Sequence, residues 1–286
     1  MFRITFLGTG GGRHTTMYQT RCTGGMLIEH GDPAKRLHVD PGPGALTQMA
    51  RIHYDLGTTD SVIISHAHPD HYSDGPSVIE GMTHGGWVKR GHIYGSPSVI
   101  SGAAGLGPTL SKYHLGLAEG YSSFVPGDTL DVDGMKVDIC RARHSDPTNV
   151  GFRFHTENGI VSYLSDTEYD EEIGRQYMGS RVLILPVTTP HDNKIPWHMC
   201  TDTAAEICAL VRPELAVFIH LGIVMIEEDP EKEAAICQER SGVRTVAGRD
   251  LMTLDVGENI SLGERRAYDG REPFIPSWAP TRQRLV

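Results

Sequence analysis

Four side chains that commonly bind metal ions occur within the six residues His66-Ala67-His68-Pro69-Asp70-His71. In an extended turn, His66 and His68 point the same way, whereas Asp70 and His71 bend back toward a second position. Imidazole and carboxylate groups together favour divalent zinc, manganese or iron, and the lack of a nearby thiolate argues against copper or an iron–sulfur cluster. The cluster therefore predicts a site for two adjacent cations.

Two coordination spheres need more ligands than this cluster supplies, and suitable residues follow three later apolar segments. The segments and the residues that follow them are 136–142 with His144, 160–164 with Asp166, and 215–219 with His220. Taken singly, each residue could be a hydrogen-bonded residue at the end of a strand. Because sheet proteins place their working groups where buried strands meet loops, the three are predicted to complete the metal site.

Short apolar segments bounded by glycine or proline predict that strands outnumber helices. The predicted strands are 3–7, 37–40, 61–65, 136–142, 150–154, 160–164, 182–185 and 215–219. Helices are predicted over 202–211, where Thr203 and Glu206 have capping-box spacing, and over 230–240. The glycines between Gly8 and Gly12 permit a tight turn or a close approach to a ligand, but they match neither GxGxxG nor the P-loop.

The sequence resembles the metallo-β-lactamase-fold hydrolase superfamily. The resemblance is carried by Leu7-Gly8-Thr9-Gly10-Gly11-Gly12, Val39-Asp40-Pro41-Gly42, the cluster at 66–71, His144, Ser165-Asp166-Thr167 and His220-Leu221-Gly222. It implies an α/β fold, a four-layer αββα sandwich with a dinuclear metal site at one edge of the two sheets. One ion would be held by His66, His68 and His144. The other would be held by Asp70, His71 and His220, with Asp166 bridging the two.

Within this superfamily the pattern is similar to ribonuclease Z and to the cyclic phosphodiesterase of phosphonate metabolism. His198, in Trp197-His198-Met199-Cys200-Thr201 ahead of a predicted helix, resembles an additional active-site histidine; alternatively, it satisfies a backbone group at the helix entry. Ribonuclease Z usually carries a long tRNA-gripping arm between the positions of His144 and Asp166, which here lie only 22 residues apart. The short interval favours the compact phosphodiesterase.

The resemblance and the residues together predict a dinuclear metal-dependent hydrolase that cleaves a small or cyclic phosphodiester. Two divalent ions, zinc or alternatively manganese or iron, would activate a bridging water as the nucleophile. Asp70 would serve both as a ligand and as the acceptor of the proton from that water. His198 would donate a hydrogen bond or a proton to the phosphate or the leaving oxygen.

Other functions remain open from the sequence. The same site could hydrolyse an ester, lactone or thioester, or could process the 3′ end of tRNA. A non-hydrolytic di-iron protein is disfavoured because its relatives carry a flavin domain, for which this length leaves no room. A non-catalytic binding module is disfavoured because no predicted ligand is missing.

Composition indicates an ordinary globular protein with one compact domain over residues 1–286, since 39% of the residues are hydrophobic and 22% are charged. The formal net charge of -10 disfavours nucleic acid as a partner. Five dispersed cysteines with no CxxC pair favour a reduced, cytoplasmic compartment. No secretory leader or membrane span is predicted, and a small-molecule substrate is expected.

Two segments stand apart from the predicted strands and helices. Residues 85–120 are rich in glycine and are interpreted as an insertion or a mobile cover over the site. Residues 265–286 combine proline with arginine and are interpreted as an extended C-terminal tail, which would offer a contact arm for a homodimer.

Overall fold

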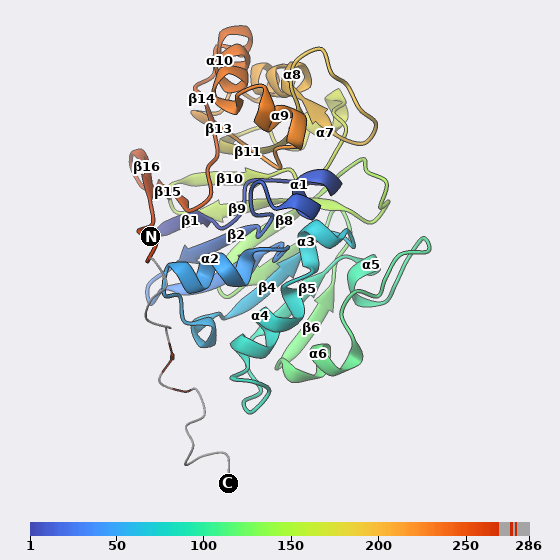
Figure 1. Ribbon diagram of the computed structural model, residues 1–286, viewed down its shortest axis with the longest axis vertical. Helices are drawn as coiled ribbons and strands as arrows, with labels where there is room; N and C mark the ends of the chain where they lie inside the picture. Colours follow the sequence, from blue (N-terminus) through green and yellow to red (C-terminus); the bar gives the residue numbers. More distant parts are fainter. Residues whose placement is uncertain (269–274, 277, 279–286) are drawn as a thin grey trace.

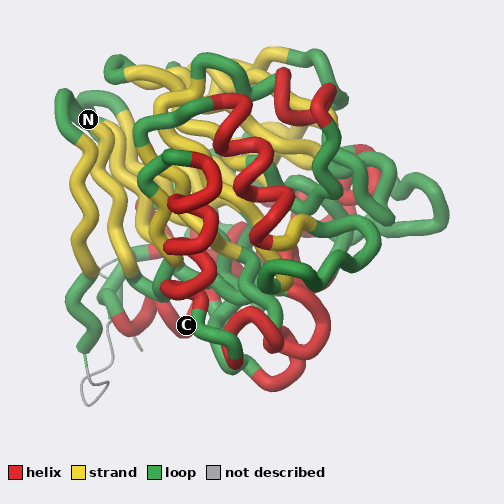
Figure 2. The backbone as a smooth tube through the Cα atoms, turned by 90° about the horizontal axis from the view of Figure 1, so that it is seen from above, coloured by secondary structure: helices red, strands yellow, loops and turns green. Residues whose placement is uncertain are grey.

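The computed structural model describes residues 1–268, 275, 276 and 278, and its strands form two sheets packed face to face (Figures 1 and 2). The first sheet has the order β16-β15-β1-β2-β3-β4-β5-β6. Its strands are β1 (Phe2–Phe6), β2 (Met26–His30), β3 (Lys35–Val39), β4 (Ser61–Ile64), β5 (His92–Gly95), β6 (Gly120–Ser123), β15 (Met252–Val256) and β16 (Ile260–Glu264). From β3 to β6 neighbouring strands are parallel, whereas the remaining pairs are antiparallel.

The second sheet has the order β14-β13-β11-β10-β9-β8-β7, with the short β12 paired to β11 outside this path. Its strands are β7 (Thr129–Val132), β8 (Met135–Arg141), β9 (Val150–Thr156), β10 (Gly159–Tyr163), β11 (Ser180–Thr189), β12 (Met199–Cys200), β13 (Leu215–Ile219) and β14 (Thr245–Ala247). β10, β11, β13 and β14 run parallel, and β7, β8 and β9 form an antiparallel meander that joins β10.

Helices cover the outer face of each sheet, α8, α9 and α10 on one side and α2 and α4 on the other (Figure 1). The helices are α1 (Gly12–Tyr18), α2 (Ala45–Arg51), η1 (Leu56–Thr58), α3 (Pro69–Tyr72), α4 (Gly75–Met82), α5 (Pro97–Ile100), α6 (Lys112–Leu117), α7 (Glu171–Arg175), α8 (Thr201–Val211), α9 (Ile223–Glu227) and α10 (Pro230–Ser241). Within the described part of the chain, no helix combines the length and the apolar character needed to cross a membrane.

Alternating burial explains the four layers. On β11, Val182 and Ile184 pack in the core between the sheets, whereas Leu183 and Leu185 pack beneath the helices. Because successive side chains of a strand point to opposite faces, a strand that is apolar at every position must be covered on both sides. The predicted four-layer αββα sandwich is confirmed.

The predicted strands and helices are present with boundaries shifted by a few residues, and β13 matches its predicted range. β11 is longer than predicted, because it continues to Thr189. The cap of α8 differs from the prediction. The backbone N–H of Cys200 donates to Thr203 Oγ1 at 3.0 Å, so Thr203 closes the capping box instead of opening one.

The glycine-rich segment 85–120 differs from the insertion or cover expected there. It carries β5, α5 and α6, and β5 lies inside the first sheet between β4 and β6. Most of the predicted tail 265–286 lies outside the described residues. Of its described residues, Tyr268 stacks on His53, and Trp278 stacks on His84 and donates to Asp55 Oδ1 at 2.6 Å.

Strand direction explains why the predicted ligands meet. β10, β11 and β13 are parallel, and β8 runs in the same direction because β9 is antiparallel to both β8 and β10. The carboxyl ends of these strands therefore share one edge of the second sheet, and the segment after β4 meets it from the first sheet. In open sheets, this is the edge at which ligands bind.

Candidate metal centre

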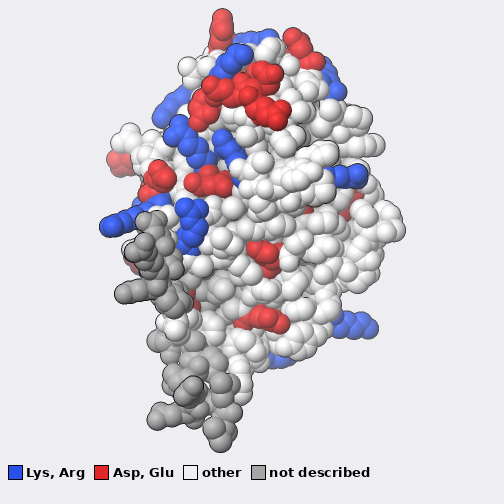
Figure 3. Space-filling model, in the orientation of Figure 1, with Lys and Arg blue, Asp and Glu red and all other residues white. Residues whose placement is uncertain are grey.

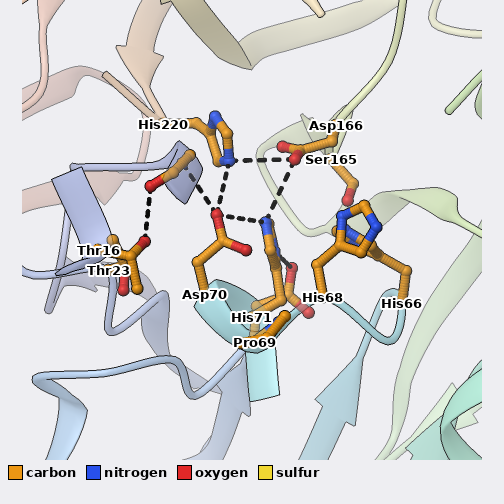
Figure 4. Close-up of polar contacts among 12 residues, drawn as sticks. Thr16, Thr23, His66, His68, Pro69, Asp70, His71, Ser165, Asp166 and His220 are labelled. Atoms are coloured by element: carbon orange, nitrogen blue, oxygen red, sulfur yellow. Dashed lines mark hydrogen bonds and ion pairs between the residues drawn. The ribbon is translucent and has the colours of Figure 1, made fainter. Parts of the chain in front are cut away.

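The segment after β4 presents four of the predicted ligands. His66 is fully buried, and its Nδ1 lies 3.0 Å from Ser65 Oγ. α3 begins at Pro69. Proline is favourable as the first residue of a helix, because a backbone N–H at that position would have no acceptor within the helix. The helix directs Asp70 and His71 toward His220 and Asp166 of the second sheet (Figure 4).

The second sheet supplies the remaining ligands from the ends of its strands. His144 lies in the loop between β8 and β9, Asp166 follows β10, and His220 follows β13 directly. Ser165 and His220 adopt left-handed backbone conformations, with φ of 52° and 55°, which non-glycine residues rarely adopt. Such backbone strain persists where the surrounding contacts hold it in place, and it is often found at functional sites.

Asp166 is the meeting point of these residues. Its Oδ2 lies 3.0 Å from His220 Nε2 and 3.4 Å from His71 Nε2 (Figure 4). The same oxygen lies 3.7 Å from His144 Nε2. Two groups result, within each of which the candidate ligand atoms lie no more than 4.8 Å apart: His66, His68, His144 and Asp166, and Asp70, His71, Asp166 and His220. The structure thus brings the seven predicted ligands together as two sets that share Asp166.

Buried polar atoms at this centre test whether a metal would fit. His66 Nε2 and Asp166 Oδ1 are buried and have no hydrogen-bond partner within the described chain, and His71 Nε2 makes an ion-pair contact with Asp166 Oδ2 at 3.4 Å in place of a hydrogen bond. An unsatisfied buried donor or acceptor costs about 1–3 kcal/mol, which a bound cation would remove. Nitrogen and oxygen donors of this kind suit zinc, manganese and iron, so the residues fit a pair of divalent ions.

Outer contacts fix which ring nitrogen faces the centre. The Nδ1 contacts are His71 with Asp40 Oδ2 at 3.0 Å, His144 with the Trp197 carbonyl at 2.9 Å, and His220 with Thr188 Oγ1 at 3.0 Å. With Nδ1 engaged outside, Nε2 is the atom left for a metal. His68 is the exception, because its Nδ1 lies 3.0 Å from His144 Nε2 and its Nε2 lies 3.4 Å from Ser145 Oγ.

The two halves of the centre have opposite electrostatic character. Burial lowers the pKa of His66 well below its ordinary value and lowers the pKa of His144 to about 4. Burial also disfavours charge on His71 and His220. However, the Asp166 and Asp70 carboxylates, with their hydrogen bonds, together outweigh burial, raising the pKa of His71 well above its usual range and that of His220 to about 9. At neutral pH the first half therefore presents neutral imidazoles, and the second half forms buried ion pairs.

His198 joins this cluster from the loop that follows β11. Its ring stacks on His220 with the centroids 5.7 Å apart, and its Nε2 lies 3.7 Å from Asp166 Oδ2. Its Nδ1 lies 3.0 Å from the Pro196 carbonyl, so the residue also satisfies a backbone group. His198 is half-buried, which leaves it accessible to a substrate at the centre.

The glycine loop approaches ligand side chains. The backbone N–H of Gly12 donates to Asp70 Oδ2 at 2.9 Å, and a Cβ atom at Gly11 would lie 2.2 Å from the ring of His220. The loop therefore packs closely against two residues of the metal centre, and its predicted approach to a bound ligand stays a prediction.

Two buried carboxylates received no role from the sequence. Asp40 accepts the Ser65 N–H at 2.7 Å and the Tyr163 hydroxyl at 3.0 Å, so it joins the first sheet to the second. Asp146 accepts the N–H of Ala67, between two of the ligands, at 3.0 Å. Their positions were the available signal, because Asp40 is the last residue of a predicted strand and Asp146 lies two residues after a predicted ligand.

A family profile described as the β-lactamase superfamily domain matches residues 35–221, a range that includes the seven clustered residues. The chain belongs to the metallo-β-lactamase-fold superfamily of metal-dependent hydrolases. An uncharacterized protein of Methanocaldococcus jannaschii is 34% identical to this superfamily member over 248 residues, which cover 86% of this chain and 92% of that protein. A ribonuclease Z of Methanosarcina acetivorans is 30% identical over 148 residues, covering 52% of this chain and about half (47%) of the ribonuclease.

Solved structures of the metallo-β-lactamase fold superpose on most of the chain. The metallo-β-lactamase fold protein YhfI of Bacillus subtilis has a TM-score of 0.72 and 20% identity, over 92% of this chain and 99% of that one. A diphosphatase of the PhnP family has a TM-score of 0.66 and 16% identity, over 90% of this chain and 98% of that one. At these identities, the superpositions establish the fold.

Proposed function

We propose that this metallo-β-lactamase-fold protein is a dinuclear metal-dependent phosphodiesterase that acts on a small or cyclic phosphodiester. The observation that carries the proposal is that two sets of buried metal-binding side chains share Asp166, with the half-exposed His198 beside them. A half-exposed imidazole beside a pair of cation sites is suited to contact a phosphoryl group or its leaving oxygen.

The two donor sets define which residues would hold the ions. His66, His68 and His144 would hold one ion, and Asp70, His71 and His220 the other, with Asp166 shared. Zinc suits these donors best, and manganese or iron would use the same atoms. When bound, the pair of cations would supply a water activated at neutral pH and would neutralise charge developing on the substrate oxygens.

The chain's own residues then supply proton transfer. Burial raises the pKa of Asp70, but the charge on His71 and the hydrogen bond with His220 together lower it by a larger amount. The pKa of Asp70 therefore lies below its ordinary value, and Asp70 is ionised at neutral pH. As a carboxylate, Asp70 can accept a proton from water. His198 presents its Nε2 toward Asp166 and would donate to a non-bridging or leaving oxygen of the substrate.

The diphosphatase of the PhnP family, which shares this fold, supports hydrolysis at phosphorus in preference to hydrolysis of a carboxylic ester. The identity with ribonuclease Z makes tRNA 3′ processing the second candidate. Between His144 and Asp166, β9 and β10 occupy most of the chain, so no arm extends there. Among the described residues on the face seen in Figure 3, acidic side chains lie between the basic ones, which therefore form no continuous basic surface for a polyanion.

The deciding experiment loads the metal-free protein with zinc or manganese. It assays bis-p-nitrophenyl phosphate, cyclic nucleotides, a lactone panel and a precursor tRNA. We expect cleavage of the small phosphodiesters that disappears on chelation and returns with metal. His198→Ala should lower kcat by about 100-fold with metal content unchanged. The exposed His14→Ala should leave both unchanged.

Each other outcome contradicts a stated part of the proposal. Activity confined to lactones or to precursor tRNA would replace the phosphodiester assignment. A loaded protein that hydrolyses none of these substrates would contradict the hydrolase assignment, and unchanged kcat in His198→Ala would remove the role of that residue.

A further inference from the structure

The loop over residues 190–198 connects β11 to β12 and brings Trp197 and His198 to the metal centre. Trp197 is 42% exposed, so core packing does not hold this residue of the loop. Its backbone has φ of 69°, a left-handed conformation that is costly for a bulky residue. Specific contacts must therefore hold the Trp197 backbone in place.

Both polar groups of the Trp197 backbone, the N–H and the carbonyl, make hydrogen bonds with residues at or near the metal centre. The Trp197 N–H donates to Glu168 Oε1 at 2.7 Å, and the Trp197 carbonyl lies 2.9 Å from His144 Nδ1. A carbonyl can only accept, so His144 carries its proton on Nδ1 and turns Nε2, its unprotonated nitrogen, toward His68 and Asp166 at the centre. Glu168 thus acts on His144 through the Trp197 residue.

Glu168 is itself fixed to the segments that carry two of the ligands. It lies two residues after Asp166, and its own N–H donates to the Arg143 carbonyl, next to His144, at 2.9 Å. The Arg143 N–H in turn donates to Thr167 Oγ1 at 2.9 Å. The Glu168 carboxylate therefore extends from a rigid junction of these two segments and reaches the loop.

A second carboxylate secures the far end of the same loop. The fully buried Glu233 on α10 accepts the His191 N–H at 2.9 Å and lies 2.7 Å from His191 Nδ1. The loop is thus held at both ends, and only the Glu168 end contacts the metal centre.

We propose that Glu168 is a positioning residue that fixes the His144 imidazole for metal binding and sets the place of the adjacent His198. The inference rests on the proposed function for its catalytic consequence. Its structural consequence, the orientation and tautomer of His144, holds independently of the reaction.

The test compares Glu168→Ala, which removes the acceptor, with Glu168→Gln, which keeps an oxygen at that place. Glu172→Ala is the matched control, because it removes an exposed carboxylate on the neighbouring α7. We expect Glu168→Ala to weaken zinc binding, measured by chelator competition, by about 10- to 100-fold, the usual cost of losing an outer-sphere contact. Glu168→Gln should recover most of the affinity, and Glu172→Ala should match the parent protein.

Two further readouts separate positioning from general destabilisation. The visible spectrum of the cobalt-loaded protein should change in Glu168→Ala, and the Nδ1–H resonance of His144 in metal-free protein should shift or be lost. The resonance is assigned by its absence in His144→Ala. Equal zinc affinity, an unchanged cobalt spectrum and an unchanged resonance in Glu168→Ala would overturn the inference.

Failure of the proposed function would give a different pattern. An inactive parent protein would contradict the hydrolase assignment. The resonance and affinity measurements on the same variants would still decide the role of Glu168.

Discussion

Gly11 shows how one position can be determined by a residue far away in the sequence. Its N–H donates to the Leu221 carbonyl at 3.1 Å, which draws the loop against the residue after His220. Any side chain there would place its Cβ 2.2 Å from the His220 ring. Either the loop or the imidazole would have to move, because real Cβ atoms do not approach other atoms so closely.

We predict that Gly11→Ala weakens metal binding at the set containing His220 by about 10- to 100-fold, since it shifts a ligand as the loss of an outer-sphere contact does. Metal content after dialysis and chelator competition measure the effect. Gly116→Ala is the control, because a Cβ at Gly116, inside α6, meets nothing within 4 Å. Equal zinc affinity in the two variants would contradict the prediction, because it would show that the loop moves aside without displacing His220.

β3 carries a buried histidine that makes stability depend on pH. His38 is fully buried, its Nε2 lies 3.1 Å from the Gly24 carbonyl, and its Nδ1 has no partner within the described chain. Burial lowers the pKa of His38 to about 4 from its ordinary value of 6.5. Between these values the unfolded chain takes up a proton that the folded protein does not, so the free energy of unfolding falls as the pH is lowered.

We predict that His38 accounts for a loss of roughly 3 kcal/mol in the free energy of unfolding between pH 7 and pH 4. His38→Gln keeps a donor for the Gly24 carbonyl but does not titrate, so it should lose less stability over this range. Urea unfolding of metal-free protein at several pH values measures the difference. Other histidines contribute equally to both proteins and cancel. Parallel stability curves for the two proteins would contradict the prediction.

At the scale of the whole molecule, the metal centre connects the two sheets along one edge of the sandwich. The segment between β4 and α3 belongs to the first sheet, whereas His144, Asp166 and His220 belong to the second. Asp40 and Tyr163 add a hydrogen bond between the sheets. A cation held by both sheets would bind only the folded arrangement, and such binding stabilises the folded state by mass action.

We predict that removing the metal lowers the melting temperature by about 5–10 °C, since metal at 100 times its Kd contributes about 2.7 kcal/mol. Scanning calorimetry with and without zinc measures the change. Asp166→Ala, which removes the carboxylate shared by both sets, should lose most of the zinc-dependent rise. A melting temperature independent of zinc in the parent protein would contradict the stabilising role.

Local patterns in the sequence predicted the kinds of ligand and the strands that carry them, whereas the layered fold was implied by the family resemblance. His66 to His71 lie in one short segment, and each later ligand lies within three residues of the end of an apolar strand, so local spacing and alternation were enough to select these residues. These signals can be read within one segment, because successive side chains of a strand point to opposite faces and each face has its own degree of burial.

The tertiary structure alone decided how those ligands are oriented. The contacts of Glu168 with Trp197, Gly11 with His220 and Asp40 with Tyr163 join residues from 29 to 209 positions apart. The place of β5 within the first sheet also depended on its neighbours, because a short strand in a glycine-rich segment has little pattern of its own. Such contacts depend on how the sheets and loops pack, and no spacing within one segment records them.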